Sequence, residues 1–190
     1  MTIRWLFVLV AFTCGLARAQ DVPPPPRPQD TGPSLDTTLK FLADKINDEG
    51  RVGYTAFVTD TSQPGVEWSN KFTAAVSNLA ADAKACRISF HWRTEVNGSS
   101  ADDKDYDIDL KDVRTIVVMP QEQNQKQIDA LRGHSAWSSR IEPNIFTLIV
   151  RRAKGIENVF LFSDEGMAGR VAKAMQHAVE LCVGGNKEPF

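Results

Sequence analysis

"FLFSDEGMAGRVAKAMQHAVELC", residues 160–182, passes from a strand-like stretch directly into a helix. Asp164 and Glu165 suit the positive N-terminal end of a helix dipole, and Gly184 and Gly185 suit its end. Apolar residues recur at helical spacing and form one stripe. The stripe consists of Met167, Val171, Ala174, Met175, Ala178 and Leu181. Because most of the preceding chain has β character, we expect this helix to cover an open side of a β-sheet.

Short β-like segments make up most of the chain before this helix. The apolar segments 144–152 and 158–163 flank "AKGIE" and predict a hairpin. Residues 86–96, "CRISFHWRTEV", alternate strictly and place Ile88, Phe90 and Trp92 on one face. The sequence therefore predicts an α+β fold, mainly β, with seven antiparallel strands. The other strand-like segments are 51–60, 66–78, 105–110 and 111–120.

Two further segments depart from the β pattern. Residues 35–46 place four apolar side chains on one helical face, with Ser34 as N-cap and Gly50 as stop, and predict an extra N-terminal helix. Residues 121–143 are polar and contain few β-formers, so we expect a surface helix or a long loop. Such an insertion can carry function.

The first 34 residues are typical of processing and tethering rather than of a fold. Arg4, the apolar run 5–13 and Ala17-Arg18-Ala19 together predict a signal peptide, residues 1–19, cleaved after Ala19. The alternative is a retained anchor, but the run is shorter than the roughly 20 residues that span a bilayer. We expect a secreted or periplasmic chain with no transmembrane segment after signal removal.

These boundaries define the predicted domain organisation. The segment 20–34 contains six prolines and predicts a disordered linker. A single globular domain is expected over 35–184, followed by a flexible tail over 185–190. Asn97 begins "NGS", a glycosylation acceptor only in a eukaryotic source.

Export changes what the cysteines predict. Cys14 leaves with the signal peptide, and Cys86 and Cys182 remain. In an oxidising compartment, two cysteines in one chain predict a disulfide. The alternative is two buried free thiols. A catalytic thiol is not expected, because no histidine is obviously placed to activate either cysteine.

The charge of the chain argues against a nucleic-acid partner. The net charge is −2, and removal of the signal peptide takes away two arginines and no acid. Proteins that bind nucleic acids normally carry a strong basic surplus. The charge therefore predicts neither a nucleic-acid partner nor adhesion to anionic membranes.

No metal or cofactor is expected. The run "DDKDYDID" places alternate aspartates, from Asp103 to Asp109, on one strand face. A calcium loop of the EF-hand kind would need glycine in place of Ile108 and glutamate in place of Arg114, so a solvated face is the better interpretation. The three histidines lie far apart in the sequence and show no H-x-x-x-H spacing.

The order "DYDIDLKDVRTIVVM", "NIFTLIVRR", "NVFLFS" and the closing helix resembles the second half of pleckstrin-homology-like (PH-like) domains. The resemblance covers residues 106–182 well and 51–96 loosely. It implies a seven-stranded antiparallel sandwich or barrel capped by a C-terminal helix, a fold that binds peptides, proteins or lipids and is rarely an enzyme. The loop "DTSQPGV" contains no base, so phosphoinositide binding does not carry over.

His134, Trp137 and Arg140 are the candidate partner-binding residues, because they lie in the polar insertion. A tryptophan in a polar loop either anchors that loop or contacts a ligand. These observations predict an exported, non-enzymatic binding or scaffold module of the cell envelope. The alternatives are a carrier of small lipid-like ligands and an enzyme with a dispersed site.

Overall fold

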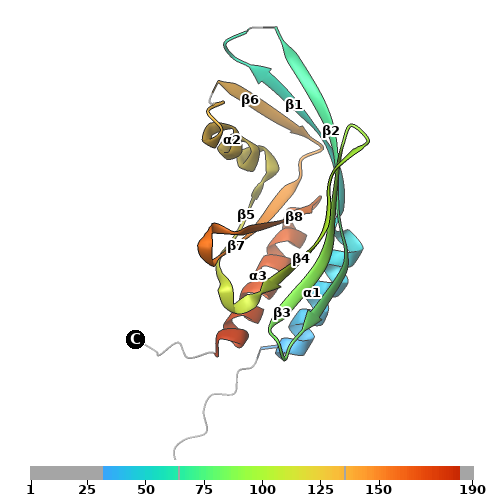
Figure 1. Ribbon diagram of the computed structural model, residues 1–190, viewed down its shortest axis with the longest axis vertical. Helices are drawn as coiled ribbons and strands as arrows, with labels where there is room; N and C mark the ends of the chain where they lie inside the picture. Colours follow the sequence, from blue (N-terminus) through green and yellow to red (C-terminus); the bar gives the residue numbers. More distant parts are fainter. Residues whose placement is uncertain (1–31, 64, 135, 185–190) are drawn as a thin grey trace, which may run out of the picture. The chain divides into compact units, whose positions relative to one another are not determined.

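The computed structural model describes residues 32–63, 65–134 and 136–184. The predicted signal peptide (1–19), most of the predicted linker (20–34) and the predicted tail (185–190) lie outside these described residues. Within them the fold is α+β and mainly β (Figure 1). The helices are α1 (Leu35–Glu49), α2 (Gln121–Leu131) and α3 (Glu165–Val183), and the strands are β1 (Arg51–Asp60), β2 (Glu67–Asp82), β3 (Arg87–Val96), β4 (Ser99–Asp109), β5 (Val113–Pro120), β6 (Trp137–Glu142), β7 (Phe146–Arg152) and β8 (Glu157–Phe162). None of the described helices is long and apolar enough to cross a membrane.

The described strands form two antiparallel sheets rather than one closed barrel. One sheet has five strands in the order β4-β3-β2-β1-β6, and the other has three in the order β5-β7-β8. Short 3-10 turns, Leu110–Asp112 and Ala153–Gly155, lead from β4 into β5 and from β7 into β8. The predicted hairpin on either side of "AKGIE" is the β7–β8 pair.

The prediction of seven strands is corrected to eight in the part of the chain that the structure describes. The eighth strand is β6, in the second half of the predicted insertion, and the first half is helix α2. Strand β6 has the sequence "WSSRIE", which contains few β-formers. It pairs with β1 in antiparallel register and buries Ile141, and these contacts outweigh its weak β-propensity.

Local signals explain where α1 and α3 begin and end. The Ser34 hydroxyl accepts a hydrogen bond from the Thr37 amide at 3.3 Å, and the Asp164 carboxylate accepts one from the Met167 amide at 2.6 Å. Helix α3 ends at Gly184, whose φ of +81° favours glycine. At Gly50, which ends α1, a Cβ atom would overlap the carbonyl oxygen of Ile46.

The core lies where helices α1 and α3 meet the sheets. Helix α1 packs against α3 and β2, and α3 also contacts β5, β7 and β8. Figure 1 shows α1 and α3 side by side, away from α2, which lies next to β6. The side chains buried in this core include Leu42, Ile88, Phe160 and Met175. The closing helix therefore packs on the small sheet and joins it to the large one.

Cys86 and Cys182 form a disulfide, as the sequence predicts. Their Cα atoms lie 5.8 Å apart, and 96 residues of sequence separate them. Cys182 lies in the last turn of α3, and Cys86 directly precedes β3. The bond therefore ties the end of the covering helix to the five-stranded sheet.

Candidate binding site

Aromatic side chains line the inner face of the five-stranded sheet. Phe90 and Trp92 of β3 and Tyr106 of β4 lie on the face that also carries the core residues Ile88 and Ile108. Phe90 and Tyr106 are direct cross-strand partners, and their nearly parallel rings have centroids 5.7 Å apart. Phe90 belongs to the core cluster that α1 and α3 also enter, and Trp92 and Tyr106 pack against this cluster.

The three aromatic residues line a pocket of about 200 Å³ together with Glu157, Asn158 and Val159 of β8. Strand β8 is the edge strand of the three-stranded sheet. The pocket therefore lies between the edge of one sheet and the inner face of the other. We refer to these six lining residues as the β8 pocket.

Asn158 is the buried polar residue of the β8 pocket. It shares a strand face with the core residues Phe160 and Phe162, and its side chain is 4% exposed. Its Oδ1 atom has no hydrogen-bond partner among the described residues. A buried acceptor without a partner costs about 1–3 kcal/mol of stability. Such a group in a pocket is a functional candidate.

A second aromatic group lies where β2 and β6 begin. The rings of Trp68 and Trp137 meet edge to face with centroids 5.4 Å apart, and the His134 ring stacks on Trp137 at 3.8 Å. Trp68 is 36% exposed, and the adjacent Val66 is 47% exposed. We call these four residues the aromatic end of the five-stranded sheet.

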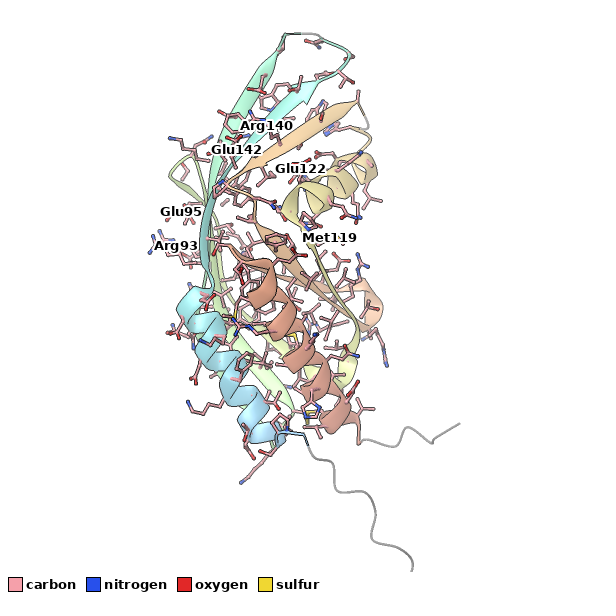
Figure 2. All side chains as sticks on the ribbon, turned by 180° about the vertical axis from the view of Figure 1, so that it is seen from behind. Arg93, Glu95, Met119, Glu122, Arg140 and Glu142 are labelled. Atoms are coloured by element: carbon pink, nitrogen blue, oxygen red, sulfur yellow. A yellow bond between two sulfur atoms is a disulfide. The ribbon has the colours of Figure 1, made fainter. Side chains whose placement is uncertain are left out.

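The structure brings together two of the three predicted partner-binding residues. His134 and Trp137 are in contact, whereas Arg140 lies on the opposite face of β6. There its guanidinium carbon is 4.2 Å from the centre of the Phe57 ring, and it pairs with Glu142 (Figure 2). Arg140 therefore does not belong to the aromatic end.

A buried polar cluster holds α2 in place. Asp129 is 4% exposed, and its carboxylate accepts hydrogen bonds from the Gln125 amide at 2.8 Å and from the Ser139 hydroxyl at 3.2 Å. Near the start of the same helix, the Gln121 carbonyl accepts hydrogen bonds from Asn124 and from Thr147 of β7. These bonds fasten α2 to β6 and β7, so α2 is part of the folded domain.

The alternate aspartates of β4 lie on the outer face of the sheet, where they meet basic residues of β3. They are Asp103, Asp105, Asp107 and Asp109. Both ring nitrogens of His91 contact carboxylates, at 2.9 Å to Asp105 and 3.0 Å to Asp103. Arg93 on the same face points away from the helices and pairs with Glu95 at 2.8 Å (Figure 2). Among the described residues, no group of three or more His, Cys, Asp or Glu side chains is arranged to hold a metal ion.

We expect the stability of the protein to depend on the protonation of His91. The hydrogen bond to Asp105, reinforced by the charge of Asp103, raises the pKa of His91 above its ordinary value. A raised pKa means that this stabilisation is fully present below the pKa of the unfolded chain and is lost as the pH rises through the folded-state pKa. The difference in denaturation midpoint between the wild type and His91→Gln should therefore shrink between about pH 5 and about pH 8.

A matched control shows whether the raised pKa of His91 comes from the carboxylates that it contacts or from the overall negative charge of this sheet face. Asp105→Asn should lower the pKa of His91, read from the ring resonances in an NMR titration. Asp107→Asn should change it much less, because Asp107 lies next to Arg87 and does not contact His91. Equal effects of the two substitutions would contradict this assignment.

Sequence reasoning missed Trp68 and the β8 pocket. Part of the signal was present, since a period of two in "ENVFLF" places Asn158 on the same face as two phenylalanines. The contact between β8 and the aromatic face of β3 depends on how the two sheets pack, which no local pattern contains. Comparisons of this chain with protein-family models, with curated proteins and with solved structures find no match.

Proposed function

We propose that the chain is an exported, non-enzymatic binding module that holds a protein or peptide partner on its aromatic end. The observation that carries the proposal is the exposure of Val66 and Trp68 next to Trp137 and His134. Tryptophan is enriched among the residues that contribute most to binding free energy at protein interfaces. A partner that covers these side chains would remove their apolar surface from water.

The aromatic end is not needed to complete the core. Neither cluster of buried core residues in the described part of the chain includes Trp68 or Trp137. The two tryptophans pack on one another and on His134. Their rings are therefore already oriented, which lowers the entropy lost when a partner binds.

The PH-like resemblance supports binding rather than catalysis. When α2 and β6 are set apart as an insertion, seven strands in two sheets remain, followed by a helix that packs against the small sheet. The resemblance implies seven strands and a closing helix, so this arrangement supports it. Export is supported by the sequence pattern of residues 1–19 and by the disulfide, since disulfides persist in oxidising compartments.

Photo-cross-linking in the native host tests the proposal. A photoreactive phenylalanine analogue in place of Val66 should give a discrete cross-linked product, identified by mass spectrometry. In a chain that also carries Trp68→Ala, we expect the yield to fall about tenfold or more, because truncating a central tryptophan costs about 2 kcal/mol or more.

Lys71 provides the control position. Lys71 is an exposed residue of β2, the strand that contains Trp68, but its side chain points to the opposite face of the sheet from that of Trp68. The same analogue at residue 71 should not give the product. The proposal fails if residues 66 and 71 give the same products, or if the product at residue 66 is unaffected by Trp68→Ala.

A further inference from the structure

We infer that the β8 pocket is a binding site for an organic ammonium ion, an amine with a small apolar or aromatic body. The site is separate from the aromatic end, and the inference does not rest on the proposed function. Three features of the pocket carry it: its size, the character of its lining and the unpartnered oxygen of Asn158.

The size of the pocket selects small ligands. Its volume of about 200 Å³ is below the roughly 300–1,000 Å³ of pockets that enclose drug-sized molecules. Phe90 and Asn158 are both 4% exposed, whereas the Glu157 side chain at the rim is 47% exposed. A ligand can therefore place an apolar body against the rings and a polar group near Asn158.

The aromatic and acidic residues of the lining are electron-rich. The faces of the Phe90, Trp92 and Tyr106 rings carry the negative part of the aromatic quadrupole, which attracts cations. Glu157 adds a carboxylate, and none of the six lining residues is basic. Two bases lie next to the lining, but each is paired with a carboxylate, Arg151 with Glu157 and Lys104 with Asp102. The aromatic faces therefore decide the preference, and they favour an ammonium group over a carboxylate or a phosphate.

Asn158 supplies the specific polar contact. Glu157 already accepts a hydrogen bond from the Arg151 guanidinium at 2.7 Å, but the Oδ1 atom of Asn158 has no partner within the part of the chain that the structure describes. Neighbouring atoms cover this oxygen, so an ammonium group in the pocket would donate a hydrogen bond to it after the Asn158 side chain turns toward the ligand. The ligand would thereby satisfy a buried acceptor that otherwise lowers the stability of the protein.

The chain itself shows that one of these rings attracts an ammonium ion. The Nζ atom of Lys104 lies 4.9 Å from the centre of the Tyr106 ring. Hydrogen bonds with the polar ends of the Tyr106 and Asp102 side chains raise the pKa of Lys104 above its ordinary value. A ligand in the β8 pocket would make the same kind of contact from inside the pocket.

Three probes of similar shape and different charge test the inference on the full, oxidised chain. They are 2-phenylethylammonium, 2-phenylethanol and 3-phenylpropanoate, each titrated into the protein and followed by NMR. We expect the ammonium to bind about tenfold more tightly than the alcohol, a difference of about 1.4 kcal/mol, which lies within the range of cation–π contacts. The carboxylate should bind most weakly. The side-chain signals of Asn158 and Trp92 should shift on binding.

Two variants locate the site. Asn158→Leu keeps the approximate size of the side chain but removes its amide, so the ammonium should lose about tenfold in affinity. The same variant should melt at a higher temperature than the wild type, because the unpaired buried oxygen is gone. Trp92→Leu should also weaken binding. Trp68→Leu, which removes a tryptophan outside the pocket, should leave binding unchanged.

Four results would overturn the inference. The first is equal affinity for the ammonium, the alcohol and the carboxylate. The second is unchanged affinity in Asn158→Leu. The third is a lower melting temperature of Asn158→Leu, since it would show that the Asn158 amide makes a stabilising bond. The last is the absence of any chemical-shift change with the three probes in the folded protein.

Discussion

Replacement of Cys182 by serine is expected to lower the free energy of unfolding by about 2–5 kcal/mol. The disulfide closes a loop between residues separated by 96 positions, and it restricts the unfolded chain. It also fastens the last turn of α3 to the start of β3, where Cys86 is 7% exposed. Urea denaturation of the oxidised chain and of the variant measures the difference. The slope of the transition should rise in the variant, because its unfolded state exposes more surface.

Reductant supplies the matched control. The reduced wild type should denature at about the same urea concentration as Cys182→Ser, and the double variant Cys86→Ser/Cys182→Ser should not respond to reductant. In a chain that still carries residues 1–19, Cys14→Ser removes the third cysteine as a competing partner. If the wild type keeps its denaturation midpoint in reductant, the two cysteines act as free thiols and the disulfide is not a source of stability.

The elements that could be predicted from the sequence are those that form through interactions between residues close together in the chain. Helix α1 begins after the predicted cap Ser34 and buries Leu39, Leu42 and Ile46 of its predicted face. Helix α3 begins after Asp164, and its hydrogen bond to the Met167 amide lies within one turn of the helix. Caps and apolar spacing concern residues within a few positions of one another, so the sequence shows them directly.

The features that could not be predicted depend on contacts between distant segments. Strand β6 forms because β1 offers it a free edge, and β1 lies about 80 positions earlier in the chain. The alternation of apolar and polar residues in β3 predicts its aromatic face. The same period of two places Asn158 on one face of β8 with two phenylalanines. That these two faces meet and leave an amide oxygen without a partner follows from the packing of the two sheets.

The same distinction applies to the predicted partner-binding residues. His134, Trp137 and Arg140 lie close together in the sequence, but the alternation of β6 sends Trp137 and Arg140 to opposite faces. Trp68 joins Trp137 from β2. A site assembled from two strands that are not neighbours in the sequence leaves no local signal beyond its tryptophans.

Replacement of Phe160 by alanine is expected to lower the free energy of unfolding by about 3–5 kcal/mol. The side chain is 1% exposed, and its ring centre lies 5.0 Å from that of Phe90. It therefore joins the three-stranded sheet, where it lies on β8, to the five-stranded sheet. Truncation removes the buried apolar surface and leaves a cavity that the two sheets and α3 cannot fill without moving.

Phe57→Ala is the matched control, because it makes the same chemical change at a half-buried position. Phe57 lies on the outer face of β1 beneath Arg140 and belongs to neither cluster of buried core residues. Its truncation should cost less than about 1.5 kcal/mol, since no enclosed cavity forms. Equal losses in the two variants, measured by urea denaturation, would show that the contact between β8 and β3 does not hold the sheets together. A large loss confined to Phe160→Ala would mean that the fold depends on the same sheet-to-sheet contact that shapes the β8 pocket.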